Sequence, residues 1–379
     1  MRKFFFSAAL AFFLLLTGCG SREQAKQETT ELFYNYTVSS SGALRFDGYS
    51  YLHFYSSETD SWVYLCNRPG CLHSDGSCGA YWGPNPPRDA FFYDGNLYVW
   101  QVASGAWDGR LIRANRYGEE REEIVTVESV PLLQSTRLVG SDQYFLGEIW
   151  EDVGNSKGKV LYRVNLENGT YDIFPRPDTG YSVEYFDDYA VTDDYLYYLY
   201  TVSDVDLNDL IDEDTFEFID ESWKEIVYRI RLYRMDRKTE EFELLLERTT
   251  EWFVPHTIEI LEPRGKQLLL VLENQVVEYD PDTGETTLLL DMATVTSDDW
   301  LNMKQVGEMW IVNMEVCSQF VLLKDWKEVA RFSAPQEAYY QAMGMCDEIV
   351  YFVRNNGLSY MNYEDLVNGD YTIRDVGRY

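Results

Sequence analysis

Histidine is scarce in this 379-residue chain, since the only three are His53, His73 and His256, far apart in the sequence. The chain also lacks the patterns that mark common hydrolases and phosphate-binding enzymes. It has no G-x-S-x-G nucleophile elbow, no glycine-rich phosphate loop and no H-E-x-x-H motif. The sequence therefore predicts no catalytic site of these kinds.

Positive charge is also in short supply. The chain has 32 Lys and Arg against 64 Asp and Glu, which gives a formal net charge of −32. Such a surface repels the phosphates of nucleic acid and anionic lipid headgroups, so we expect no nucleic-acid partner. An acidic surface could concentrate cations or meet a basic partner, but the solubility of an exported protein explains it without any partner.

The N-terminus lacks a hydrophobic run long enough for a transmembrane helix. The run from Phe4 to Leu16 has 13 residues, whereas a membrane-spanning helix needs about 20. A basic pair precedes this run, and small residues separate it from Cys19. This order is typical of a secretion signal, so residues 1–18 are predicted to be a signal peptide.

The tetrapeptide from Leu16 to Cys19, LTGC, resembles the lipobox of bacterial lipoproteins. The resemblance implies a diacylglycerol on Cys19 that anchors the protein in the lipid bilayer of the cell membrane, facing outside the cytoplasm. Two acyl chains give stable anchoring where one does not. An ordinary signal peptide with a chance cysteine is the alternative. Residues 19–31 have no hydrophobic pattern and are predicted to form a flexible tether.

Aromatic residues, in contrast, are abundant at 16% of the chain and favour strands. A polar or glycine-containing pair followed by an alternating aromatic and aliphatic run recurs seven times, at spacings of 39 to 72 residues. The copies start at Asp47, Asp94, Ser141, Asp193, Gly265, Gly307 and Cys346. Repetition at this period indicates a repeat architecture.

A second strand-like segment follows the first in most units and runs into a turn rich in Asn, Asp, Gly and Thr. These segments start at Leu111, Leu161, Leu232 and Val276. Three or four short antiparallel strands in about 45 residues match the blade of a β-propeller. Residues 32–379 are therefore predicted to form an all-β propeller. Seven blades are favoured, and six remain open because the first unit is short of a fourth strand, which Leu32–Val38 could supply by pairing with C-terminal strands.

One interruption of the repeat is the Cys/His loop, residues 66–90. Cys66, Cys71, His73 and Cys78 form a C-x4-C-x-H-x4-C cluster. Three thiolates and an imidazole could complete a tetrahedral zinc shell. The spacing is not that of a standard zinc finger, however, and in an exported protein disulfides are the favoured interpretation, with a bridge between Cys317 and Cys346 as one candidate and unpaired core cysteines as a further alternative. Five cysteines besides Cys19 leave an odd thiol, and the C-x-x-C-H pattern of a c-type haem is absent.

The other interruption is an acidic insertion, residues 203–226. It places Asp204, Asp206, Asn208 and Asp212 at ligand positions of a twelve-residue calcium loop. The segment lacks two residues that such a calcium loop requires, because Asp209 stands at the position of the turn glycine and Thr215 at the position of the bidentate glutamate. A short acidic amphipathic helix is the favoured alternative to calcium. We expect both interruptions on one face of the propeller, beside its central channel.

Four tryptophans lie in the interruptions or in loops after second strands and are candidates for ligand stacking: Trp82, Trp107, Trp150 and Trp223. Packing in the core or anchoring of loops is the alternative for each ring.

The lipobox, the aromatic repeat and the Cys/His loop together resemble a group of bacterial lipoproteins of Gram-positive type with propeller domains. The resemblance implies localisation and fold but no activity. The sequence leads to the hypothesis of a binding or protein-interaction module that uses one loop-rich face for a glycan, a peptide or an envelope protein. Two alternatives are a polymer-degrading hydrolase or lyase with channel-facing carboxylates, and an envelope assembly factor.

Overall fold

The structure is a computed structural model. It describes residues 27–33, 36–39, 42–46, 51–56, 61–73, 76–83, 87–102, 108–128, 130–152, 155–205, 226–250, 258–295, 300–314, 319–334, 340–346, 348–354 and 357–375. The predicted signal peptide, Cys19 and most of the acidic insertion lie outside these residues.

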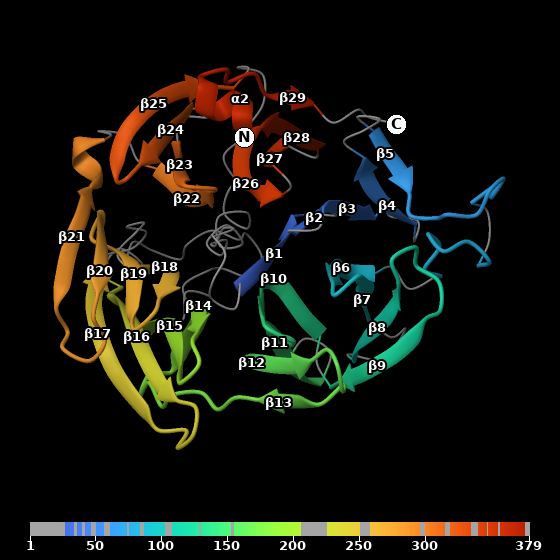
Figure 1. The fold of residues 1–379 in the computed structure, drawn as a ribbon. Helices are drawn as coiled ribbons and strands as arrows, with labels where there is room; N and C mark the ends of the chain where they lie inside the picture. Colours follow the sequence, from blue (N-terminus) through green and yellow to red (C-terminus); the bar gives the residue numbers. More distant parts are fainter. Residues whose placement is uncertain are drawn as a thin grey trace, which may run out of the picture. The chain divides into compact units, whose positions relative to one another are not determined.

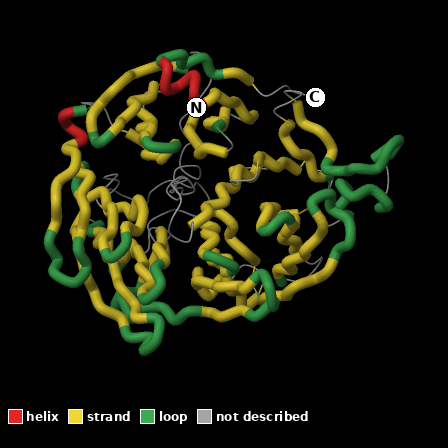
Figure 2. The backbone as a smooth tube through the Cα atoms, viewed as in Figure 1, coloured by secondary structure: helices red, strands yellow, loops and turns green. Residues whose placement is uncertain are grey.

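The chain folds as a seven-bladed β-propeller of four-stranded antiparallel sheets (Figure 1). The prediction of an all-β propeller with seven blades is thus confirmed, and the six-blade alternative is wrong. Helix in the described residues is limited to the 3-10 turn η3 (Met292–Thr294) and α2 (Tyr363–Asn368), as Figure 2 illustrates. No described helix is both long and apolar enough to cross a membrane.

The described residues belong to two compact units. One comprises residues 17–174 and 298–379 and holds five blades. Blade 1 is β2–β5 (Tyr36–Ser39, Gly42–Phe46, Leu52–Ser56, Ser61–Tyr64), and blade 2 is β6–β9 (Pro87–Tyr93, Asn96–Val102, Gly109–Asn115, Glu122–Val127). Blade 3 is β10–β13 (Val130–Val139, Asp142–Asp152, Asn155–Asn165, Tyr171–Ile173). Blade 6 is β22–β25 (Trp300–Val306, Met309–Met314, Gln319–Lys324, Lys327–Ser333), and blade 7 is β26–β29 (Tyr340–Cys346, Ile349–Arg354, Gly357–Asn362, Arg374–Asp375).

The second unit includes residues 175–297 and holds two blades. Blade 4 is β14–β17 (Val183–Val191, Tyr195–Ser203, Tyr228–Asp236, Phe242–Thr250), and blade 5 is β18–β21 (Ile258–Arg264, Gln267–Leu272, Gln275–Tyr279, Thr286–Asp291). Blades 4 and 5 pack together through aliphatic side chains and Tyr197 and Tyr279.

The repeated aromatic and aliphatic runs form the second strand of six blades, and the run from Asp47 leads into β4, the third strand of blade 1. Second strands such as β7 are buried on both faces, because β7 lies between blades 1 and 3. Outer strands such as β13 are exposed. This burial explains why the second strands carry the strongest hydrophobic signal in the sequence.

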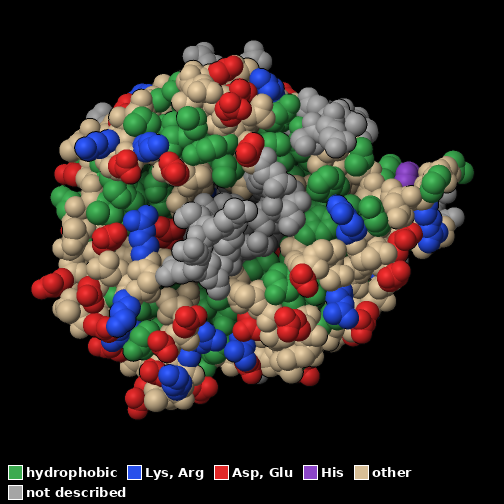
Figure 3. Space-filling view, viewed as in Figure 1, with side chains coloured by type: hydrophobic (Ala, Val, Ile, Leu, Met, Phe, Trp, Pro, Cys, Tyr) green, Lys and Arg blue, Asp and Glu red, His purple; other side chains and the backbone are tan. Residues whose placement is uncertain are grey.

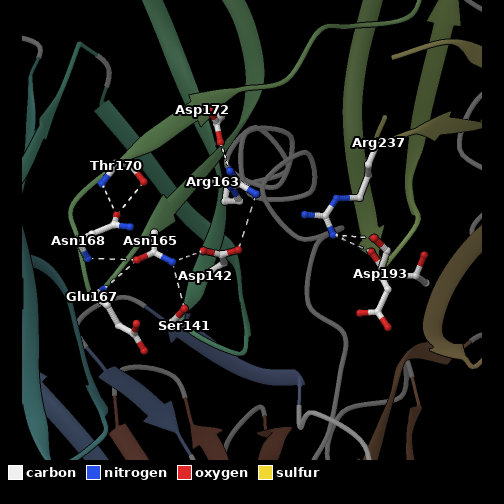
Figure 4. A network of polar contacts seen from close by, with 11 residues as sticks. Ser141, Asp142, Arg163, Asn165, Glu167, Asn168, Thr170, Asp172, Asp193 and Arg237 are labelled. Atoms are coloured by element: carbon white, nitrogen blue, oxygen red, sulfur yellow. Dashed lines mark hydrogen bonds and ion pairs between the residues drawn. The ribbon is translucent and has the colours of Figure 1, made fainter. Parts of the chain in front are cut away.

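The turn after the third strand repeats a single hydrogen-bond pattern. It begins with Asn115, Asn165, Asp236 or Asp280, whose side-chain oxygen accepts hydrogen bonds from backbone N–H groups two to four residues later. In blade 3, Asn165 also donates to Asp142 at 2.8 Å, which ties the third strand to the second (Figure 4). These side chains favour the turn locally, which is why the segments align in sequence.

The N-terminal segment does not close the ring as the sequence suggested. Strand β1 (Gln27–Phe33) starts within the segment predicted to be a tether and pairs with β10 through Gln27–Thr30. Its last residues pair with β2, so β1 joins blades 1 and 3 into one nine-stranded sheet. Blade 7 obtains its fourth strand from β29. Leu32–Val38 thus does supply a strand to the first unit, because β2 completes blade 1, but the predicted pairing of this segment with C-terminal strands is wrong.

Candidate metal centre

The Cys/His loop connects β5, the last strand of blade 1, to β6, the first strand of blade 2. The segment after β5 extends away from the sheets in Figure 1. Figure 3 shows hydrophobic side chains and a histidine on this projection. Backbone hydrogen bonds fix its two ends, because Leu65 donates to Leu52 at 3.0 Å and Leu52 donates to Ala80 at 2.8 Å.

Four soft ligand atoms converge in this loop. One ligand atom each from Cys66, Cys71, His73 and Cys78 lies within 4.8 Å of all the others. His73 Nδ1 and Cys78 Sγ are 3.2 Å apart. With Zn–S near 2.3 Å and Zn–N near 2.0 Å, a tetrahedral shell separates its ligand atoms by about 3.5 to 3.8 Å. Small side-chain rotations would therefore complete a shell of three cysteines and one histidine.

Backbone N–H groups favour a thiolate at Cys66. Burial raises the pKa of the Cys66 thiol, but hydrogen bonds from the backbone of Arg68 and Gly79 and from the thiols of Cys71 and Cys78 lower it below its ordinary value. Since zinc binds thiolates, these N–H groups are placed as a metal-bound sulfur needs them.

Cys78 is the buried member of the group, with 1% of its side chain exposed. Burial raises the pKa of the Cys78 thiol to about 12, and a hydrogen bond from the backbone of Ala80 opposes this effect only in part. A divalent cation would replace the proton of this thiol and offset the cost of a buried negative charge.

An aromatic ring orients His73. The imidazole stacks on Tyr64 of β5 with ring centroids 4.1 Å apart and an angle of 16° between the planes. The backbone of His73 has φ = 51°, a conformation that non-glycine residues rarely adopt. The stack and the turn together direct Nδ1 toward Cys78.

The loop packs against the β8–β9 turn of blade 2. A Cβ on Gly79 would lie 2.1 Å from the carbonyl oxygen of Tyr117, so only glycine fits this approach. Arg121 donates to the carbonyl of Gly79 at 2.8 Å and lies 3.9 Å above the ring of Trp82. Arg68 pairs with Glu119 at 2.8 Å. These contacts hold the loop and the turn together.

We expect Gly79→Ala to weaken zinc binding at least tenfold and to destabilise the protein by about 1–3 kcal/mol, because the new methyl group forces two backbones apart. Gly76→Ala is the matched control in the same loop, since its Cβ would meet only Tyr81 at 3.8 Å. Competition with a chelator and thermal unfolding would measure both effects. Equal zinc affinities for the two variants would contradict the role assigned to this contact.

The structure thus brings Cys66, Cys71, His73 and Cys78 together, and the three cysteines are not in disulfides. Cys317 lies outside the described residues, as does the side chain of Cys346, so the bridge proposed between them stays a prediction.

The candidate tryptophans and the candidate calcium ligands are described only in part. Trp82 is only 4% exposed and anchors the loop beneath Arg121. Trp107 and Trp223 lie outside the described residues, and of Trp150 only the backbone, in β11, is described. Of the calcium candidates, Asp204 is exposed, and Asp206, Asn208 and Asp212 lie outside the described residues.

The predicted common face for the two interruptions likewise involves residues 206–225, outside the described part. The described contacts of the Cys/His loop are with β5, with the start of β4, with the β8–β9 turn and, through Trp82, with Gln101 of β7. Sequence reasoning missed Tyr64 and Gly79 as parts of the site. Their only sequence signal is proximity to Cys66 and Cys78, because the partners that define their roles lie on other strands.

These observations define the chain as a seven-bladed β-propeller with a preformed group of one histidine and three cysteines. No protein family matches the sequence, and no curated protein does. Solved structures do match. A prolyl endopeptidase is 12% identical with a TM-score of 0.54, and the match covers 97% of this chain and 51% of that one.

Two further matches cover most of both chains. The β-propeller domain of the Trilobed protease from Pyrococcus furiosus is 10% identical with a TM-score of 0.44, over 97% of this chain and 96% of that one. BamB from Moraxella catarrhalis is 10% identical with a TM-score of 0.39, over 88% and 93%. At these identities the likeness concerns the fold alone, and this chain spans about half the length of the prolyl endopeptidase.

Proposed function

We propose that this protein is a lipid-anchored binding module on the outer side of the cytoplasmic membrane, and that its Cys/His loop is a zinc-held contact element. One observation carries the proposal: the four converging metal ligands lie in a loop that also bears the most exposed large hydrophobic side chain of the described chain, Leu72, at 87% exposure. A hydrophobic side chain that projects from a loop held in shape by a metal, with the half-exposed ring of Tyr64 stacked on the ligand next to it, is placed to contact another molecule.

Zinc is the favoured metal because of the donor set. Thiolates and imidazole prefer zinc over magnesium or calcium, which prefer oxygen ligands. Four protein ligands fill the tetrahedral shell and leave no position for a substrate or a reactive water, which is typical of structural zinc. The metal would therefore hold the loop in shape, and contacts by the surrounding side chains would provide binding.

The anchor follows from the sequence around Cys19. A diacylglycerol on this cysteine would keep the propeller at the membrane, with residues 20–26 in the linking segment. We expect Cys19→Ser to move the protein from the membrane fraction to the soluble fraction of the cells. The partner would be a glycan, a peptide or an envelope protein, whereas nucleic acid is disfavoured by the net charge of −32.

Capture from solubilised envelopes tests the binding role. The wild-type protein should retain a partner that Leu72→Asp, with its zinc intact, retains at least tenfold less. Screening the same pair on a glycan array extends the test to carbohydrate. Retention that Leu72→Asp leaves unchanged would contradict a contact role for the loop, and turnover of a wall polymer by both proteins would favour the hydrolase alternative.

A further inference from the structure

A tight turn joins two of the candidate metal ligands, Cys66 and Cys71. The backbone N–H of Cys71 donates to the carbonyl of Arg68 at 3.2 Å, with Pro69 and Gly70 between them. Gly70 has φ = 71°, and a proline followed by a residue with positive φ is typical of a type II turn. The turn reverses the chain and returns Cys71 to the side of Cys66.

The sulfurs of these two cysteines are in contact. The thiol of Cys71 donates a hydrogen bond to the sulfur of Cys66. Both sulfurs belong to the group whose ligand atoms all lie within 4.8 Å of one another. Because the turn already holds the two backbones, rotation of two short side chains could bring the sulfurs to the separation of about 2.05 Å that a disulfide needs.

This pair of sulfurs is also accessible to small molecules. Cys66 and Cys71 are partly exposed, whereas Cys78 is buried. Peroxides oxidise thiolates rather than thiols. A metal holds its cysteine ligands as thiolates, so the exposed ligands of this site are also its most oxidisable sulfurs.

The proposed location outside the cytoplasm makes oxidation relevant, because thiols there lack the glutathione and thioredoxin that keep cytoplasmic cysteines reduced. Two chemical states are then available to the loop. In one state the three unbridged cysteines and His73 bind a metal, and in the other Cys66 and Cys71 form a bridge. Both states use the same two sulfurs, so each state excludes the other.

We propose that the Cys/His loop is a redox switch, in which a peroxide converts Cys66 and Cys71 into a disulfide and thereby releases the zinc. The inference rests on the proposed function for the zinc itself. Its new content is the regulation of the site, with a small peroxide as the oxidant and the C-x4-C pair as the reacting group.

The reaction has two steps. The thiolate of Cys66 attacks one oxygen of hydrogen peroxide, and the O–O bond breaks to leave a sulfenic acid on Cys66 and a hydroxide ion. The thiolate of Cys71 then attacks the sulfenic sulfur, which forms the S–S bond and releases a second hydroxide ion. The two sulfurs together lose two electrons, and the two oxygens of the peroxide gain them.

Loss of the metal would act on the proposed contact element. Leu72 lies between Cys71 and His73, so zinc would fix the backbone on both of its sides. After oxidation, His73 and Cys78 remain as two ligands, which bind zinc weakly, and the His73 side of Leu72 loses the restraint that the metal supplied. We therefore expect the oxidised protein to bind its partner more weakly than the zinc-bound form.

Zinc release under peroxide tests the switch. The full-length protein in detergent, loaded with zinc, is mixed with a chromogenic zinc chelator and then with hydrogen peroxide. Zinc should stay bound until peroxide is added. Peroxide should then release one zinc per chain with the loss of two thiols, and peptide mapping should find the Cys66–Cys71 disulfide. Dithiothreitol with added zinc should restore the bound metal.

Zinc that stays bound under peroxide would overturn the switch and leave the proposed zinc site intact. A bridge to Cys78, or release of zinc with the cysteines oxidised to sulfinic acids, would also overturn it. A protein that holds no zinc before peroxide is added would contradict the proposed function together with the switch.

Gly70→Ala and Gly83→Ala test the part played by the turn. Both glycines have positive φ, 71° and 86°, and an added Cβ would meet nothing within 4 Å at either, so each substitution strains only its own backbone. Gly70 lies between Cys66 and Cys71, whereas Gly83 lies beyond all four ligands. Dimedone, which traps sulfenic acids, should label Cys66 of Gly70→Ala about fivefold more than wild type, because Cys71 is less well placed to react. Gly83→Ala should behave like wild type, and equal labelling of the two variants would overturn the pairing of the cysteines by this turn.

Discussion

Replacing Cys78 with serine is expected to remove zinc from the protein and to lower the free energy of unfolding by about 4 kcal/mol, when free zinc is about 1,000-fold above the Kd of the wild type. Cys78 is the buried ligand, and His73 Nδ1 lies 3.2 Å from its sulfur. Serine offers a hard, neutral oxygen in place of a thiolate, so the remaining three ligands bind the metal weakly.

Metal analysis, thiol counting and thermal unfolding with and without a chelator would measure this effect. The wild type should contain one zinc per chain and lose stability on chelation, and Cys78→Ser should not respond to the chelator. Asn67→Ala is the control, because Asn67 is an exposed neighbour of Cys66 that is not a ligand. A wild-type protein without zinc, and equally stable with and without chelator, would contradict the metal centre.

Trp100→Ala is expected to destabilise the protein by about 3–5 kcal/mol through loss of packing between blades 2 and 3. The Trp100 side chain is fully buried and meets the ring of Phe145 edge-on, with centroids 5.0 Å apart. Its indole Nε1 donates a hydrogen bond to Gln143 Oε1 at 3.0 Å. The substitution leaves both a cavity and a buried amide oxygen without this donor.

Urea unfolding would measure this loss. Trp100→Phe separates its two parts, because phenylalanine keeps most of the ring packing and removes the donor, which should cost about 1–3 kcal/mol. Tyr171→Ala, on the exposed outer strand β13, should change stability by less than about 0.5 kcal/mol. Similar losses for Trp100→Ala and Tyr171→Ala would show that the interface between these blades contributes little to stability.

The blade repeat could be predicted because its signals are local. The run Leu97–Trp100 in β7 is hydrophobic throughout, since this second strand is covered on both sides. Asn165 and its counterparts mark the turn after the third strand through bonds to their own neighbours. Both signals arise within a few residues, so they recur in the sequence wherever a blade recurs in space.

Strand partners at the N-terminus could not be predicted in this way. Leu32–Val38 has the composition of a strand, but β1 pairs with β10, about a hundred residues later, and with β2. An edge strand can pair with any open edge, and the choice depends on which edges the rest of the fold leaves unpaired.

For the metal ligands too, the sequence predicted one part of the site and the structure showed the other. Spacing identified Cys66, Cys71, His73 and Cys78 as a group but left disulfide, metal and free thiol open. The structure leaves the three thiols unbridged and places Nδ1 of His73 beside Cys78. That arrangement depends on Tyr64 of β5 and on the β8–β9 turn, and neither contact is encoded in the spacing of the cysteines.

The sequence by itself determined the seven repeated hairpin units, their turns and the four residues that could bind a metal, because hydrophobic alternation and turn chemistry act over short distances along the chain. Only the tertiary structure decided which strands pair at the N-terminus and how the Cys/His loop is held. Those features depend on packing between strands that are distant in sequence, and local sequence signals carry no information about such contacts.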